Sequence, residues 1–446
     1  MNAGRRVVIT GLGAVAPSGV GVPALWEAVA AGRSGISVLD GAEFDGSPVR
    51  IGGRVRGFEA PALLEPALAR RLSPVQHWAV AAADEALAQA GAAGAAGAAG
   101  AAARALPWDP LRAAVIAATG SGPVDAMQAA TRALDARGPR AVPLALAMHG
   151  APDAAAALVA QRYGMHGPAQ GVSATCASGA IALGEGLRRI RHGYADAVLV
   201  IGMEDCLNRV NLASNANMRA LAAGYEDAPA AACRPFDRAR SGFVMSQGAA
   251  AVLLEAEEAA RARGAVALAE LAGFGASSDA HHPTAPHPEG RGGAEAVRLC
   301  LADAGAAPGA VDHINAHGTG TPAGDAAELR ALASALREGA ARIPITATKS
   351  STGHLLGASG AIEAVISVMT LLSGLIPPTL NLEDPEFAGW DFVREGARRA
   401  NVGSVLSTSF GFGGHNAALL IRGAGDGAAV AAETASPGAE EGRNHT

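Results

Sequence analysis

Short apolar runs alternate with segments of helical periodicity along most of the chain. In the first part, apolar runs predict strands at residues 7–10, 113–117, 197–201 and 249–255. Between these runs, apolar positions recur every three or four residues and predict helices at 24–31, 75–90, 153–163 and 181–191. This alternation of strands and helices is typical of α/β layers.

A second series of the same kind begins after a helical segment at 257–263. It predicts strands near 267–274, 313–316, 343–347 and 417–421, and helices at 294–304, 326–336 and 361–373. We therefore predict two α/β halves, residues 1–260 and 261–422, although no repeat is visible in the sequence itself. The glycine-alanine run 91–103 predicts a loop insertion. Residues 423–446 lack periodicity and predict a disordered tail.

Composition and charge narrow the class of protein. A chain of 446 residues can bury a large core. The net charge of −6 and the lack of a basic run with interleaved aromatics argue against nucleic-acid binding. No apolar stretch is predicted to span a membrane, and the run 6–10 is too short for a signal-peptide core. Four cysteines without a CxxC pair fit a reducing compartment, so we expect a cytoplasmic protein.

One cysteine occupies a position that favours a catalytic nucleophile. Cys176 lies in the sequence SATCASG, residues 173–179, just before the predicted helix 181–191. A thiol at a helix N-terminus faces unpaired backbone N–H groups and the positive end of the helix dipole, and both favour the thiolate. Taken alone, the motif is equally compatible with a small buried residue, which is the usual role of an unmodified cysteine.

Two histidines occupy glycine-rich turns in the second half. His317 lies in NAHGTGTPAGD, residues 315–325, and His354 lies in KSSTGHLLGASG, residues 349–360. Each turn follows a predicted strand and precedes a predicted helix, and sites in open α/β sheets are built at that edge. A third such turn, SFGFGGHN, spans residues 409–416. A single histidine of this kind often only satisfies loop carbonyls, whereas both motifs together with Cys176 indicate a catalytic site.

Taken together, the motifs resemble a known family. The motifs SATCASG, HGTGTP, KSSTGHLLGASG and GFGG occur in the order of the elongating β-ketoacyl–acyl carrier protein synthases of the thiolase superfamily. RPFD, GFV and SSDA match as well, and the resemblance runs from residue 7 to about 422. It implies a thiolase-like five-layered αβαβα sandwich of two similar halves. It also implies an acyltransferase that condenses an acyl thioester with a malonyl-loaded carrier, adds two carbons and releases CO2.

The resemblance assigns a role to each catalytic side chain. Cys176 would hold the acyl chain as a covalent thioester. His317 and His354 would donate ring N–H groups to the enolate oxygen that forms when the malonyl unit loses CO2, and each such donor is worth roughly 3–4 kcal/mol. Lys349 would orient and support the histidines. Glu328 would be the carboxylate that partners this lysine.

Substrate contacts follow from the same resemblance. Backbone N–H groups of Cys176 and Phe412 would form an oxyanion hole, and Phe412 would also be the aromatic gate of the acyl site. Phe410 would be a further substrate contact. Thr319 and Thr321 would bind the phosphopantetheine arm, which the acyl carrier protein supplies, so that no bound cofactor and no metal are expected.

Macromolecular partners are expected as well. Arg70 and Arg71 lie where the family places basic residues that dock the acidic carrier protein, with Arg54 and Arg56 as weaker candidates. Family members dimerise, so we expect a homodimer or a heterodimer with a related ketosynthase-like subunit.

One segment departs from the family pattern and bears on the substrate. Asn215 stands where elongating synthases tend to have a pocket-lining phenylalanine, and Asn208, Asn211 and Asn217 add polarity. The segment 148–150 also differs. We therefore predict a more polar or differently shaped acyl pocket, suited to a polyketide, polyene or otherwise functionalised chain.

Three other interpretations have less support. A non-catalytic chain-length partner would lack Cys176, although a subunit that is active only with a related partner stays open. A thiolase would need a second catalytic cysteine, and Cys300 lies in a predicted amphipathic helix and not in a glycine turn. The loop histidines His281, His282 and His287 have no cysteine or carboxylate cluster nearby in the sequence that would complete a metal site.

Overall fold

The computed structural model describes residues 4–59, 69–70, 72–92, 106–146 and 150–425. Within them, one large sheet consists of two halves, with the spatial orders β6-β5-β7-β8-β1 and β11-β10-β14-β15-β9, and of the short strand β2 (Gly19–Val20). The first half contains β1 (Val7–Ala16), β5 (Ala113–Ala118), β6 (Ala169–Val172), β7 (Ala197–Glu204) and β8 (Gly248–Ala256). The second half contains β9 (Ala269–Ser278), β10 (His313–Asn315), β11 (Ile345–Thr346), β14 (Ser404–Gly411) and β15 (His415–Gly423).

The two halves repeat the same topology. If the strands of each half are counted along the chain, both halves have the spatial order 3-2-4-5-1. The second strand is parallel to the third and the fourth, and the fifth is antiparallel to the fourth and the first. The halves join where β1 pairs with β9, at Val8 with Glu270 and Ile9 with Ala269. The predicted pair of similar halves is therefore present in the topology, although no sequence repeat reveals it.

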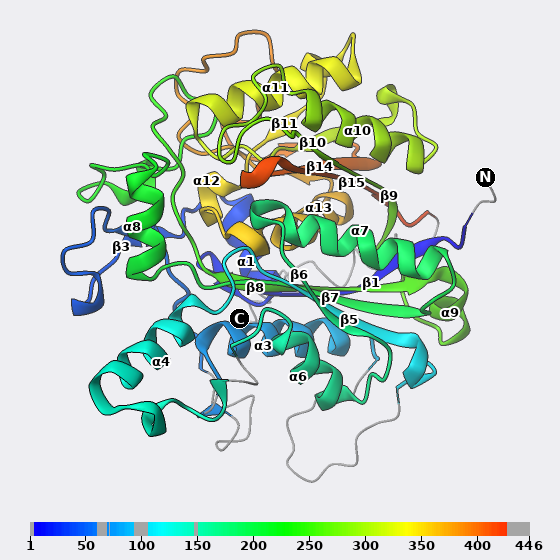
Figure 1. Cartoon of the computed structure of the whole chain (residues 1–446). Coiled ribbons are helices and arrows are strands. Elements are labelled where there is room, and N and C mark those ends of the chain that lie inside the picture. Colours follow the sequence, from blue (N-terminus) through cyan, green and yellow to red (C-terminus); the bar gives the residue numbers. More distant parts are fainter. Residues whose placement is uncertain (1–3, 60–68, 71, 93–105, 147–149, 426–446) are drawn as a thin grey trace, which may run out of the picture.

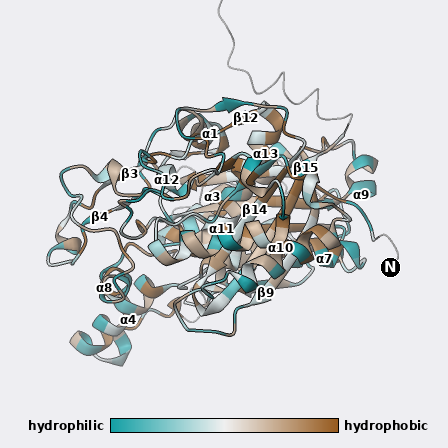
Figure 2. Cartoon of the chain, turned by 90° about the horizontal axis from the view of Figure 1, so that it is seen from above, coloured by the Kyte–Doolittle hydropathy of each residue, from teal (hydrophilic) through white to brown (hydrophobic). Residues whose placement is uncertain are grey.

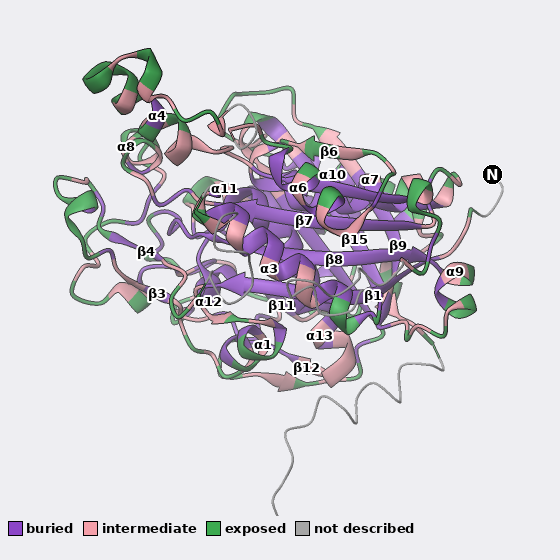
Figure 3. Ribbon diagram, turned by 90° about the horizontal axis from the view of Figure 1, so that it is seen from below, coloured by how far each residue is buried: buried purple, intermediate pink, exposed green. Residues whose placement is uncertain are grey.

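Helices cover both faces of each half-sheet and complete five layers (Figure 1). The central layer contains α7 (Ser178–Arg191) and α13 (Ser359–Ser373). The outer layers contain α3 (Pro74–Gln89) and α6 (Ala154–Tyr163) on the first half, and α10 (Arg291–Asp303) and α11 (Pro322–Leu336) on the second. Hydrophobic residues concentrate around α13, β14 and β15 (Figure 2), and β1, β7 and β8 are buried along their length (Figure 3).

The central helix α13 is apolar on nearly all sides. Together with the short 3₁₀ turn that precedes it, this helix forms the segment Leu356–Ser373, which has the length and composition of a membrane span, so the prediction that no such segment exists is wrong. Most of this segment is buried, and Ile362, Val365 and Ile366 pack in the hydrophobic cluster between the two half-sheets. A helix that is hydrophobic all round is typical of the core of a large domain as well as of a membrane.

The structure describes further α-helices and two small strand pairs. The helices are α1 (Val22–Ala30), α4 (Val124–Arg137), α8 (Arg209–Asn217), α9 (Glu257–Ala262) and α12 (Lys349–Thr352). The small strand pairs are β3 (Ile36–Val38) with β4 (Ile51–Gly53), and β12 (Leu375–Ile376) with β13 (Arg398–Arg399).

Two predictions about the second half need correction. The turn at 409–416 does not lead into a helix, because it is the tip of an antiparallel hairpin in which Phe410 of β14 pairs with Asn416 of β15. The tail was predicted to begin at residue 423, but β15 extends through Gly423. The remainder of the predicted tail from 426, and most of the predicted insertion at 91–103, lie outside the described residues.

Candidate active site

The loop that carries Cys176 is strained and tied on two sides. Cys176 lies in the 3₁₀ turn η5 (Thr175–Ala177), which runs directly into α7. Thr175 has a φ of 49°, a left-handed conformation that is costly for a β-branched residue. Its hydroxyl donates to the carbonyl of Phe412 at 2.8 Å, and the hydroxyl of Ser178 donates to the carbonyl of Thr175 at 2.6 Å. Strain of this kind persists where neighbouring contacts hold the backbone, and it clusters at functional sites.

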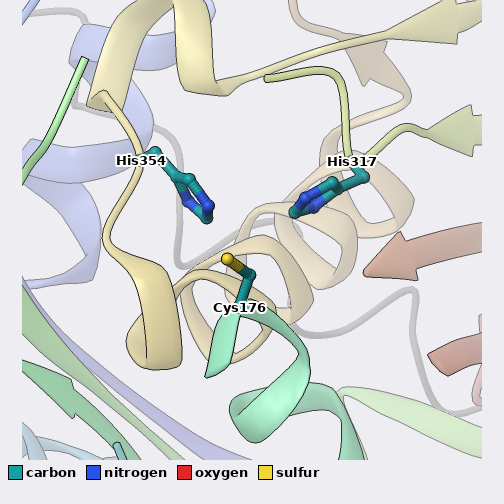
Figure 4. Close-up of side chains that lie close together, drawn as sticks. All are labelled: Cys176, His317 and His354. Atoms are coloured by element: carbon teal, nitrogen blue, oxygen red, sulfur yellow. The ribbon is translucent and has the colours of Figure 1, made fainter. Parts of the chain in front are cut away.

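His317 and His354 approach Cys176 from the second half of the chain. His317 follows β10, and His354 follows α12. The sulfur of Cys176 and a ring nitrogen of each histidine all lie within 4.8 Å of one another. The thiol points into the space between the two imidazoles (Figure 4), whose planes meet at 84°. The fold thus brings together three side chains that lie far apart in the sequence.

Burial keeps these three groups neutral near neutral pH. It raises the pKa of the Cys176 thiol to about 11, although the backbone N–H of Phe412 and the charge of Lys349 favour the thiolate. Backbone N–H groups thus favour the thiolate, as the sequence predicted, but desolvation outweighs these contacts and keeps the thiol protonated. Burial, and then the charge of Lys349, lower the pKa values of His317 and His354 well below the usual range. Each neutral imidazole offers one N–H donor and one free lone pair.

Neighbouring groups determine how the imidazoles are protonated. The ammonium of Lys349 lies 3.3 Å from Nδ1 of His317. Because an ammonium only donates, Nδ1 accepts and the proton of His317 is on Nε2. Nδ1 of His354 lies 2.9 Å from the hydroxyl of Ser359, a group that both donates and accepts, so either tautomer of His354 is possible. Nε2 of His354 is buried without a partner among the described residues, which leaves it available for chemistry.

The carboxylate that pairs with Lys349 is not the one that the sequence analysis assigned. Glu363, on α13, forms the salt bridge with the ammonium of Lys349. Glu328, on α11, instead accepts the backbone N–H groups of His317 at 2.7 Å and Gly318 at 2.8 Å. The ionic partner of Lys349 is therefore Glu363 and not Glu328. The sequence contained one signal for it, since Glu363 is the only charged residue of α13.

A thiolate and two imidazoles are also a set of zinc ligands. Here the thiol holds its proton and the ammonium of Lys349 lies against His317, so both the proton and the charge oppose a metal cation. The loop histidines His281 and His287 lie ring to ring at 4.9 Å, but within the described residues no third ligand joins them. The donor set therefore favours nucleophilic and acid–base chemistry.

A cavity of about 340 Å³ surrounds these groups. Its inner wall contains Cys176, His317, His354, Phe410 and Phe412. Thr319 and Thr321 also line it, with their hydroxyl oxygens 3.0 Å apart. The exposed residues Arg219 and Thr284 line it too, which places its mouth beside them. The cavity thus leads from the surface past two hydroxyls to the thiol.

Comparisons with known proteins give the family of this chain. The model of the N-terminal domain of β-ketoacyl synthase matches residues 4–260, and the model of its C-terminal domain matches residues 268–383. The chain belongs to the β-ketoacyl synthase family. It is therefore an acyltransferase of the ketosynthase class, as the order of its motifs predicted.

Curated relatives match this synthase over nearly its whole length. It is 38% identical to the 3-oxoacyl-[acyl-carrier-protein] synthase 2 of Synechocystis sp., with 94% of this chain and 98% of the relative aligned. The protein of the same name from Coxiella burnetii is 37% identical, with 94% of this chain and 98% of the relative aligned.

Solved structures of ketosynthases confirm the predicted thiolase-like fold. A type II polyketide acyl-carrier protein in complex with its ketosynthase matches with a TM-score of 0.84 at 30% identity, covering 94% of this chain and 100% of that one. The ishigamide ketosynthase/chain length factor matches with a TM-score of 0.84 at 32% identity, covering 95% of this chain and 100% of that one.

Some residues predicted for the site of the synthase lie elsewhere. Asn215, on α8, donates to the carbonyl of Asn211 at 2.9 Å and does not line the cavity around Cys176. Arg70 is exposed and does not line it either, and Arg71 lies outside the described residues. Arg219, which the sequence analysis did not select, lies at the mouth, and no motif marks it.

Proposed function

We propose that this synthase extends an acyl chain by decarboxylative condensation with malonyl-loaded acyl carrier protein. The observation that carries the proposal is the approach of the Cys176 sulfur and two neutral imidazoles to within 4.8 Å. A nucleophile alone serves acyl transfer, whereas two N–H donors beside it also serve an enolate. The shared name of the curated relatives, 3-oxoacyl-[acyl-carrier-protein] synthase 2, supports the same reaction.

In the first half-reaction the acyl chain moves from its carrier to Cys176. The thiol passes its proton to Nε2 of His354 while the sulfur attacks the thioester carbonyl. Backbone N–H groups of Cys176 and Phe412, both within hydrogen-bond reach of the sulfur, stabilise the oxyanion that forms. Collapse of this intermediate expels the pantetheine thiolate, which takes the proton from His354.

In the second half-reaction the malonyl unit occupies the same cavity and loses CO2. The electrons of the broken C–C bond pass into an enolate, whose oxygen accepts the Nε2–H of His317. It also accepts the Nε2–H of His354 after this ring has exchanged, between the half-reactions, to the tautomer with its proton on Nε2, which the Ser359 hydroxyl permits by donating to Nδ1. The enolate carbon attacks the Cys176 thioester, and the departing thiolate regains a proton from solvent. Loss of one such donor typically costs roughly 3–4 kcal/mol, so the pair accounts for much of the acceleration.

A thiolase reaction lacks its second cysteine in this cavity. Cys300 packs with Val297 and Leu332 in the hydrophobic cluster of the outer helices α10 and α11. Among the described residues that line the cavity, Cys176 is the only cysteine. Decarboxylation is therefore the better-supported route to the carbon nucleophile.

The acyl carrier protein is the proposed macromolecular partner. Its phosphopantetheine arm enters beside Arg219 and passes Thr319 and Thr321, whose hydroxyls offer hydrogen bonds to the arm's amides. Arg219 and Arg70 are exposed cations that suit an acidic carrier. The solved complex of a type II polyketide carrier with its ketosynthase supports this partner.

The second element of the proposal is a related subunit that binds the synthase. We also propose that the synthase acts in the cytoplasm. Met127 and Leu134 of α4 and Val210 of α8 are exposed apolar side chains on one face. Val210 lines two grooves there, of about 580 and 600 Å³, and the second also has the polar lining residue Asn217. The solved ishigamide ketosynthase/chain length factor supports a related subunit as the partner.

Mass spectrometry with acyl carriers tests the whole proposal. The purified protein is incubated with a panel of saturated and functionalised acyl carriers and then with malonyl carrier. We expect acyl mass on Cys176, followed by a β-ketoacyl carrier two carbons longer. Equal use of plain saturated chains would contradict the polar pocket. If Cys176 is never acylated, even after co-expression with a related subunit, the condensation itself is wrong.

A further inference from the structure

Glu204 lies at the end of β7, fully buried, and no step of the proposed reaction uses it. One of its carboxylate oxygens accepts the backbone N–H groups of Gly120 at 2.6 Å and Gly357 at 2.9 Å. The other accepts the hydroxyl of Thr119 and the N–H of Ser121, both at 3.2 Å. Gly120 belongs to the first half of the chain and Gly357 to the second, so the carboxylate joins the two halves.

Both segments that Glu204 joins lie beside catalytic groups. The 119–121 segment packs against the Cys176 loop, because the hydroxyl of Ser178 lies 3.2 Å from the carbonyl of Thr119. A Cβ atom added to Gly120 would lie 3.1 Å from the carbonyl oxygen of Thr175. On the other side, Gly357 comes three residues after His354 in the same turn.

The two turns are strained in the same way. Thr175, next to Cys176, has a φ of 49°, and Leu356, two residues after His354, has a φ of 43°. Non-glycine residues persist in this region only where surrounding contacts hold them. The backbones of Gly120 and Gly357 are also in such close contact that a Cβ on Gly357 would lie 2.1 Å from the nitrogen of Gly120.

We propose that Glu204 is a positioning residue for condensation, whose carboxylate holds the His354 turn against the loop that carries Cys176. All of its partners are donors, so an acceptor-only carboxylate satisfies them together, and a side-chain amide cannot. The Cys176 loop keeps its bonds to Phe412 and Ser178 without Glu204, whereas the described bond between Gly357 and the first half's Glu204 is lost. The kinetic part of this inference rests on the proposed function.

The variant Glu204→Gln tests the inference with two readouts. In steady-state condensation we expect kcat to fall about 100-fold with the KM for malonyl carrier unchanged, because a displacement of about 1 Å has an effect of this size. Acylation of Cys176 in a single turnover should slow as well, because Nε2 of His354 takes the thiol proton in that step. Crystal structures of both proteins provide the second readout, in which we expect a longer distance from the Cys176 sulfur to Nε2 of His354 in the variant.

Glu255→Gln is the matched control. Glu255 is a buried carboxylate at the opposite end of the same strand pair, where it faces Ala197, while Glu204 faces Gly248. It bonds Trp108 and Arg263, away from the cavity. We expect this variant to lose stability and keep both its kcat and its rate of Cys176 acylation. Should Glu204→Gln not fold, Thr119→Val removes one donor and should lower kcat about fivefold with KM unchanged.

The outcomes separate the two proposals. A loss of condensation in Glu255→Gln as large as that in Glu204→Gln would show a general structural effect and would overturn the positioning role. If the wild-type protein forms no product, the proposed function fails, and the crystallographic distance alone decides on Glu204. An unchanged distance overturns the inference, and a longer one supports it.

Discussion

The ammonium of Lys349 lies 3.3 Å from Nδ1 of His317, and both side chains are buried. This contact places the single imidazole proton of His317 on Nε2, the nitrogen that can serve the cavity. The same ammonium lowers the pKa of His317 after the larger effect of burial, so the ring stays a neutral donor. Lys349 thus determines which nitrogen of His317 can donate a hydrogen bond. The carboxylate of Glu363 compensates the positive charge of Lys349.

Replacing Lys349 with methionine should remove its effect on the imidazole proton of His317. Lys349→Met keeps the length of the side chain but removes the donor to His317, so the proton is free to move to Nδ1. We expect malonyl decarboxylation to fall roughly 100- to 1,000-fold, the effect of losing one oxyanion donor. Acylation of Cys176, measured by mass spectrometry of the intact protein, should be reduced much less. Equal losses in both half-reactions would contradict the role in orienting His317.

The two histidines should contribute unequally to the two half-reactions. His317→Ala removes an enolate donor and should lower decarboxylation roughly 100- to 1,000-fold while acylation of Cys176 continues. His354→Ala should slow both steps, because Nε2 of His354 also takes the thiol proton. Single-turnover acylation and CO2 release, measured on both variants, test the difference. Comparable acylation in both variants would remove His354 as the base.

The sequence was enough to predict which side chains form the site, but it did not reveal all the contacts that hold them in place. The spacing of Cys176, His317 and His354 in strand-to-helix motifs was enough to expect a shared site, and apolar periodicity located most core elements. The ionic partner of Lys349 was missed because it depends on how α13 packs between the half-sheets, which periodicity does not reveal. Glu204 was missed for the same reason, since its four partners come from two segments, 119–121 and 357, that lie far apart in the sequence.

Local patterns also failed where burial or exposure decided the outcome. The helix N-terminus suggested a thiolate at Cys176, but desolvation is a property of the whole fold and has the larger effect. The strands β6 and β14 and the helices α4 and α8 were not predicted. Eight of the fourteen residues of α4 are exposed, and Ala130 is its only buried residue. Such a helix is determined by contacts outside its own sequence.

The pH dependence of thiol alkylation should reveal the raised pKa of Cys176. Because that pKa is about 11, the thiol is neutral below it and its reactive thiolate fraction grows about tenfold for each pH unit on the acid side. Iodoacetamide labelling of Cys176, followed by mass spectrometry, should therefore keep accelerating up to about pH 10 without a plateau. Cys176→Ser is the control for labelling at other cysteines. A plateau near pH 8.5, the value for a free cysteine, would contradict the effect of burial.

The hydroxyls of Thr319 and Thr321 should act on binding and not on chemistry. They lie 3.0 Å apart in the cavity wall between Arg219 at the mouth and the catalytic groups. Thr319→Val removes one hydrogen bond to the arm, worth about 1 kcal/mol, and should raise the KM for acyl carrier about fivefold with kcat unchanged. Steady-state kinetics with carrier-bound and short pantetheine-free substrates test this, since only the former should lose affinity.

Glu328 should affect the stability of the protein as well as the reaction. Its carboxylate accepts the N–H groups of His317 and Gly318 and the hydroxyl of Thr408 at 2.7 Å, all within the buried interior. In Glu328→Gln the amide nitrogen must face at least one of these donors and leave it unsatisfied, which costs about 1–3 kcal/mol of unfolding free energy. Urea denaturation measures this loss, and CO2 release should fall with it because the His317 turn loses its anchor. Thr408→Val is the matched control: it removes the hydroxyl that donates to Glu328 and also lies 3.1 Å from the N–H of His317, but it leaves both backbone bonds to Glu328 in place, so decarboxylation should change little. A Glu328→Gln protein with wild-type stability would show that the turn does not depend on the carboxylate.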